Sequence, residues 1–159
     1  MKIWIWYVIA LAFAAYWASN LILWYPWSYS PILGMTIMLT VNPVLWAYVT
    51  VLGIRSYPGQ RVSAAVSLIA VVFLVLAIVA DYLFFALIRG ALEELYHPTT
   101  FYGYAFLVFW PVLIGSLFGK NMLKNPKPLN WENLAYVGAW GFGCMGIIAV
   151  IIWLDIKLF

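Results

Sequence analysis

The side chains best suited to chemistry lie in one stretch, between Asp81 and His97. Asp81 is the only acidic residue inside any of the long apolar runs, and an ionisable group within a membrane span is a functional hypothesis by default. Glu94 and His97 are three residues apart, the spacing that carboxylate-bridged di-iron sites use in helical bundles. The stretch therefore offers two hypotheses, a coupling carboxylate and a metal site.

The metal hypothesis is limited by the number of ligands. A di-iron site needs the Glu-x-x-His motif twice with further carboxylates, and the chain has one histidine and five acidic residues. What remains is a site for a single metal, or one completed by a partner, at Glu94 and His97. The alternative is a solvated helix face just before the turn at Pro98, and the sequence favours this interpretation.

The depth of Asp81 bears on the coupling hypothesis. A helix that begins near Val62 has risen roughly 28 Å by Ala80, at 1.5 Å per residue. That distance nearly crosses a hydrocarbon core, so we expect Asp81 at the far interface. It is either a group that couples protons or ions, or a carboxylate that meets water at low cost. Arg89, two turns on, is about 12 Å away along the helix axis.

Prolines at the middle of two apolar runs give a separate signal. Asn42 and Pro43 lie at the middle of the second run, and Pro111 lies near the middle of the fourth. Paired interrupted helices at mid-membrane point to the binding site of a transporter. The structural alternative is that proline is common in membrane helices and that asparagine forms hydrogen bonds between helices.

Two tryptophans, Trp46 and Trp110, lie deep in the same two runs. They could stack on a ligand, and helix packing explains them equally well. The sequence thus gives a hypothetical ligand site of six residues. These are Asn42, Pro43, Trp46, Asp81, Trp110 and Pro111.

Recognised catalytic patterns are otherwise missing from the sequence. There is no glycine-rich phosphate loop at a strand–helix junction, and Cys144 is the only cysteine. A Ser-His-Asp arrangement could use only His97, and there is no nucleophile elbow. We therefore predict no cofactor and favour a protein that is not an enzyme, with an intramembrane enzyme as the last alternative.

Composition determines what must position these residues. The chain of 159 residues is 67% hydrophobic and 8% charged, whereas soluble domains carry about 25% charged residues. The bilayer must therefore be the solvent for most of the chain, and only helices and closed barrels satisfy the backbone there. The apolar runs are continuous and about twenty residues long, which predicts helices.

The prediction is an all-α membrane protein, a single domain over residues 1–159. We expect a bundle of five transmembrane helices, with an amphipathic extension after the third. The spans are predicted at residues 3–24, 32–54, 62–88, 101–118 and 134–154. In the last of them Ala135, Ala139 and Gly143 recur every four residues, which predicts a small-residue packing face.

The distribution of charge predicts the orientation. With an inner N-terminus, six Lys and Arg residues lie inside and two lie outside. The inner six are Lys2, Arg55, Arg61, Lys120, Lys124 and Lys127. This bias favours a cytoplasmic N-terminus and an outer C-terminus, in a plasma membrane or a bacterial inner membrane. The basic residues are spread over several loops, so the partner is the lipid bilayer and not nucleic acid.

Two functional interpretations of different class remain. In the first, the protein binds or translocates a small solute or lipid between its helices, near Asn42, Pro43 and Pro111, with Asp81 as a coupling group. In the second, it is a non-catalytic accessory or scaffold subunit of a larger membrane complex or a homo-oligomer. Its small-residue faces would then be its interface with other membrane subunits.

Overall fold

The computed structural model describes residues 1–88, 90, 92–124 and 126–158. Over these residues the chain is helical and forms no strand. The long helices are α1 (Lys2–Tyr29), α2 (Pro31–Arg55), α3 (Val62–Asp81), α4 (Pro98–Lys124) and α5 (Trp131–Leu158). Within the described residues, five helices are long and apolar enough to cross a membrane. The all-helical class and the number of candidate spans are thus confirmed.

The junction between α1 and α2 is shorter than predicted. We expected a loop from Tyr25 to Pro31, but Ser30 alone separates the two helices. The Ser30 N–H donates to the carbonyl of Pro26 at 3.0 Å, and the Gly34 N–H donates to the carbonyl of Ser30 at 2.9 Å. A Cβ at Gly34 would meet the side chain of Trp27 and lie 2.9 Å from its Cα. Glycine is therefore required where these two helices meet.

The chain divides into two compact units. One comprises Thr50–Pro128 together with Met1, and the other comprises Lys2–Val49 with Leu129–Phe159. The division falls within α2, so this helix contributes to both. The first is called the α3–α4 unit below and the second the α1–α5 unit, after the helices that pair in each.

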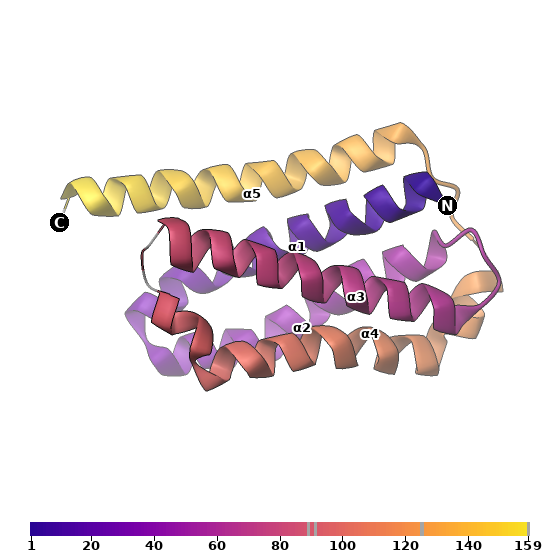
Figure 1. The fold of residues 1–159 in the computed structure, drawn as a ribbon, viewed down its shortest axis with the longest axis horizontal. Coiled ribbons are helices and arrows are strands. Elements are labelled where there is room, and N and C mark those ends of the chain that lie inside the picture. Colours follow the sequence, from indigo (N-terminus) through magenta and orange to yellow (C-terminus); the bar gives the residue numbers. More distant parts are fainter. Residues whose placement is uncertain (89, 91, 125, 159) are drawn as a thin grey trace. The chain divides into compact units, whose positions relative to one another are not determined.

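In the α3–α4 unit the two helices run antiparallel (Figure 1). Gly115 and Gly119 of α4 lie directly against Val66 and Val62 of α3. A Cβ at either glycine would overlap a valine Cγ atom, and valine side chains are stiff because they branch at Cβ. The four-residue spacing of these glycines brings the two backbones close together, as in small-residue membrane packing.

In the α1–α5 unit the two helices run in the same direction (Figure 1). Gly141 lies against Phe13 and Ala14, and the rings of Phe13 and Phe142 are 5.0 Å apart. Small residues do therefore meet in this pair, but at one position of α5 that was not predicted.

The small-residue face predicted for α5 is exposed in the described part of the chain, and its packing on another subunit stays a prediction. Ala135, Ala139 and Gly143 are exposed, and no described atom lies within 4 Å of a Cβ built at Gly143. The contact uses Gly141 instead, because the missing Cβ there leaves room for the broad ring of Phe13. Covering an aromatic ring gains more dispersion energy than joining two small side chains.

The segment after α3 also differs from the prediction. An amphipathic helix was expected, but Tyr82–Ile88 is a π-helix and Leu92–Tyr96 is a short 3-10 helix. Gly90, between them, has φ of 64°. This is the left-handed region that glycine adopts without steric cost, and it interrupts a continuous helix. Arg89, the basic residue expected on this face, lies outside the described residues.

Candidate functional site

Asp81 is held by a tyrosine from the neighbouring helix. The hydroxyl of Tyr104 donates a hydrogen bond to Oδ2 of Asp81 at 2.8 Å, and both side chains are half-buried. Asp81 is the last residue of α3, and Tyr104 is in the second turn of α4. Antiparallel packing places the end of one helix beside the start of the next, so the two residues lie at the same level.

The regular hydrogen bonding of α3 ends at this carboxylate. The backbone N–H of Tyr82 is shared between the carbonyls of Ile78 and Val79, and the π-helix begins at the same residue. Widened π turns inside helices are frequent at functional sites. Asp81 therefore sits where the helix changes its pitch, next to a polar partner.

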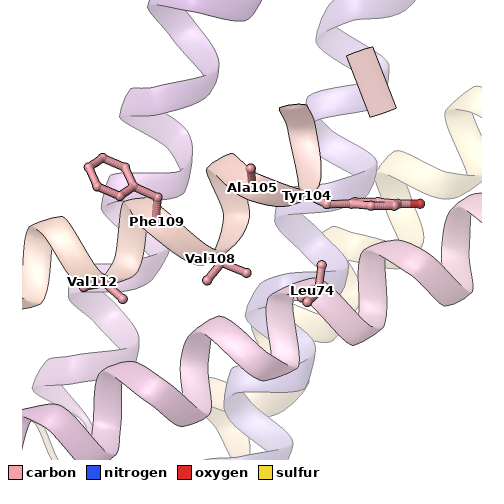
Figure 2. Close-up of a pocket in the computed structure, with 6 residues that line it drawn as sticks. All are labelled: Leu74, Tyr104, Ala105, Val108, Phe109 and Val112. Carbon is pink, nitrogen blue, oxygen red and sulfur yellow. The ribbon is translucent and has the colours of Figure 1, made fainter. Parts of the chain in front are cut away.

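A groove between α3 and α4 begins at this pair. It is shallow and largely open to its surroundings, with a volume of about 510 Å³. Figure 2 shows Leu74 on α3 and five residues on α4, with the Tyr104 ring toward one end of the row and Val112 at the other. The lining residues are Leu74, Tyr104, Ala105, Val108, Phe109 and Val112. Apart from the tyrosine hydroxyl these side chains are apolar.

The length of the groove follows from the helix rise. From Tyr104 to Val112 the chain advances eight residues, which is about 12 Å at 1.5 Å per residue. An elongated apolar groove with one polar end suits an amphiphile better than a compact polar solute.

The six residues of the hypothetical ligand site are divided between the two units. Asn42, Pro43 and Trp46 belong to the α1–α5 unit, and Asp81, Trp110 and Pro111 belong to the α3–α4 unit. Of these six, Asp81 accepts a hydrogen bond from Tyr104, which lines the groove. The hypothesis that Asn42, Pro43 and Pro111 lie at one ligand site stays a prediction.

The helices continue through both prolines. α2 is helical across Pro43, and α4 is helical across Pro111, which is fully buried. The interruptions expected at mid-membrane are thus not seen, because the remaining backbone bonds of each helix are sufficient to hold it. The nearby threonines do not compensate for Pro43: Thr36 and Thr40 donate to the carbonyls of Ile32 and Thr36 in their own turns.

The two tryptophans are packed differently. Trp46 is 5% exposed. Trp110 is half-buried and stacks on Phe106, with ring centroids 5.2 Å apart and planes at 28°. Phe106 lies one turn before Trp110 on the same helix. This agrees with the packing interpretation of that residue, and the groove lining given above does not include it.

The side-chain amide oxygen of Asn42, Oδ1, is buried, and no described residue donates a hydrogen bond to it. Asn20 behaves differently, since its Nδ2 donates to the carbonyl of Tyr16 at 2.9 Å. A buried acceptor without a donor costs about 1–3 kcal/mol. The role of Asn42 as a hydrogen-bonding link between helices is therefore not supported for this oxygen.

This difference gives a prediction for two asparagines of one unit. Asn42→Leu should raise the free energy of unfolding by about 1 kcal/mol, because it removes an unsatisfied acceptor. Asn20→Leu should lower it by a similar amount, because it removes a formed bond. Thermal unfolding of both variants in the same detergent measures the two shifts. A loss of stability in Asn42→Leu equal to that in Asn20→Leu would show that the Asn42 amide is bonded after all.

His97 caps the N-terminus of α4. Its Nδ1 lies 2.8 Å from the hydroxyl of Thr99 and 3.4 Å from the backbone nitrogen of the same residue. Side chains that accept from the first N–H groups of a helix act as N-caps. The side chain of Glu94 lies outside the described part of the structure. Among the described residues no three His, Cys, Asp or Glu side chains are grouped to hold a metal ion.

Three residues that form or support this site were not predicted from the sequence, although each had a signal: Tyr104 at the site itself, and Gly115 and Gly119 in the helix contact that supports it. Tyr104 lies near the start of the fourth apolar run. If the third and fourth helices are antiparallel, this start lies at the same depth as the end of the third run. Gly115 and Gly119 form a Gly-x-x-x-Gly motif, which is a known packing pattern of membrane helices.

Comparison of the chain with protein-family models, with curated proteins and with solved structures gave no match. Interpretation of the site therefore depends on its own geometry.

Proposed function

We propose that this is an integral membrane protein that binds an acyl chain of a lipid or similar amphiphile in the groove between α3 and α4. The observation that carries the proposal is the groove itself, about 510 Å³ in volume, with an apolar lining and the Asp81–Tyr104 pair at one end. Ligand sites combine an apolar surface with a few polar groups that fix orientation. The orientation predicted above, with the N-terminus cytoplasmic, is part of this proposal.

The polar pair gives the site a direction. Tyr104 lines the groove with its ring and donates its hydroxyl to Asp81. Asp81 ends a helix of 20 residues, so the pair lies close to the membrane–water boundary when α3 spans the bilayer. A lipid would place its chain along Ala105, Val108 and Val112 and its polar region near the pair.

The groove can be tested by filling it. In Ala105→Trp we expect labelling of α3 and α4 by a diazirine-bearing acyl lipid to fall by about tenfold, which corresponds to about 1.4 kcal/mol. Crosslinked peptides identified by mass spectrometry measure this labelling. Leu117→Trp is the matched control, because Leu117 is on the same helix, is 62% exposed and does not line the groove.

Two results would contradict this function. One is labelling spread evenly over the exposed faces of the candidate spans in the unmodified protein. The other is an equal loss of labelling in both tryptophan variants. Either would mean that the acyl chains are ordinary boundary lipid.

A second function is favoured by one observation on α5. Ala135, Ala139 and Gly143 form an exposed row, which a helix of another subunit could contact closely. This arrangement would suit the accessory or scaffold subunit considered above. Co-purification of a second membrane protein that is lost in Ala139→Leu would support it. The subunit hypothesis would be contradicted if the unmodified protein and Ala139→Leu both purified alone and with the same mass.

A further inference from the structure

Three separate segments of the α3–α4 unit converge at the end opposite to Asp81. Gly119, near the end of α4, lies against Val62 at the start of α3. The backbone N–H of Lys127 donates to the carbonyl of Arg55 at 2.8 Å, which joins the segment after α4 to the end of α2. Figure 1 shows the α2–α3 loop and the end of α4 at the same end of this unit.

Every one of these segments carries exposed cations. They are Arg55 at the end of α2, Arg61 before α3, and Lys120, Lys124 and Lys127 at and after the end of α4. These five residues are called the basic end below. The acidic residues Asp81 and Glu93 of this unit lie at and after the last residue of α3, which is the opposite end of that helix. Glu132, the nearest acidic residue in sequence, belongs to the other unit.

Charge bias between loops is sufficient to orient a membrane protein even when the charges are scattered. In this protein the charged segments also contact one another, because a backbone hydrogen bond and a glycine contact hold the three segments together. Arginine presents paired N–H donors that fit phosphate oxygens, and lysine adds a point charge. At the end of membrane-length helices such groups lie at the depth of lipid headgroups.

We propose that the basic end binds the phosphate group of an anionic phospholipid. The proposal rests on the membrane insertion proposed above but not on the acyl groove, which begins at the opposite end of α3. The occupant is a membrane lipid, because the cations surround the ends of candidate spans and are not placed in a separate soluble domain.

The test uses the full-length protein in vesicles of equal parts phosphatidylglycerol and phosphatidylcholine. Lipids retained after mild detergent extraction are counted by native mass spectrometry. One cation at a membrane surface gives about a fivefold preference for an anionic lipid. We therefore expect Arg55→Gln/Arg61→Gln/Lys127→Gln to reduce the retained phosphatidylglycerol-to-phosphatidylcholine ratio more than tenfold. The backbone bond between residues 55 and 127 needs neither side chain and should persist.

The matched control is Lys2→Gln/Arg89→Gln/Lys157→Gln, which removes the same charge from three residues that are not among the five of the basic end. It should keep the preference of the unmodified protein. Equal ratios in the two triple variants would overturn the proposal, because net charge alone would then explain retention. Displacement of the lipid by millimolar inorganic phosphate would also overturn it, since the ligand would then be a soluble anion.

The preference for phosphatidylglycerol can also be tested without variants, by measuring it on the unmodified protein at increasing salt concentrations. Raising the ionic strength shortens the Debye length from about 10 Å at 0.1 M to about 3 Å at 1 M. The preference for phosphatidylglycerol should fall over this range if exposed cations hold the headgroup. A preference that does not change with salt would contradict binding at the basic end.

Discussion

Gly115→Ala is expected to lower the free energy of unfolding by about 1–3 kcal/mol, the range for an overpacked interior. The added methyl group would overlap Cγ2 of Val66 and lie 3.6 Å from Cδ1 of Ile54. Valine relieves the overlap only by leaving its preferred rotamer or by moving α3 away from α4. Reversible unfolding in mixed micelles, followed by circular dichroism, measures the change.

Gly143→Ala is the matched control on α5. A Cβ at Gly143 meets no described atom within 4 Å, so the variant should gain about 0.5–1 kcal/mol from the lower backbone entropy of alanine. The opposite signs of the two glycine variants are the critical result. If both variants gained stability, α3 and α4 would not pack through Gly115.

A size exchange isolates the contact further. In Gly115→Ala combined with Val66→Ala, the valine Cγ atoms that block the new methyl group are gone. Contacting residues show interaction energies of about 0.5–3 kcal/mol in double-mutant cycles. We expect the double variant to lose less stability than the two single variants lose together, and the difference should be about 0.5–3 kcal/mol.

Tyr104→Phe is expected to cost about 1.5–3 kcal/mol, the range for a hydrogen bond to a charged group. The ring remains to line the groove, but Oδ2 of Asp81 loses the donor that now lies 2.8 Å away. Because Asp81 is half-buried, water replaces that donor only in part. The change is measured as for Gly115→Ala.

Tyr102→Phe provides the control for the hydroxyl. Tyr102 is on the same helix and is 74% exposed, so its variant should stay within about 0.5 kcal/mol of the unmodified protein. Asp81→Asn should cost less than Tyr104→Phe, because the amide keeps an oxygen that accepts from the tyrosine. Equal stability of the two phenylalanine variants would mean that the Asp81–Tyr104 bond contributes nothing to the pairing of α3 and α4.

The sequence by itself determined the class of the protein and the number of its long helices. Runs of about twenty apolar residues leave the backbone no other way to satisfy its hydrogen bonds in lipid. The residue type at Gly90 also permits the break there, because glycine adopts positive φ without steric cost. These features are local, because each depends on the residues of a single segment.

Only the tertiary structure decided which face of each helix packs. In a soluble helix the apolar stripe identifies the buried face, but in lipid the exposed face is apolar as well. The rotation of α5 on α1 therefore could not be derived from its composition. A Cβ at Gly141 would meet Phe13 and Ala14 of α1, whereas a Cβ at Gly143 would meet open space.

The partner of Asp81 was decided in the same way. The carboxylate was evident in the sequence, but its bond to Tyr104 joins residues 23 positions apart. That bond depends on the register of two antiparallel helices, and the register is set by Gly115 and Gly119 against two valines at the other end of the pair. A shift of one turn would move Tyr104 by about 5.4 Å and remove it from reach. The polar end of the candidate site is thus a consequence of close backbone packing elsewhere in the same pair of helices.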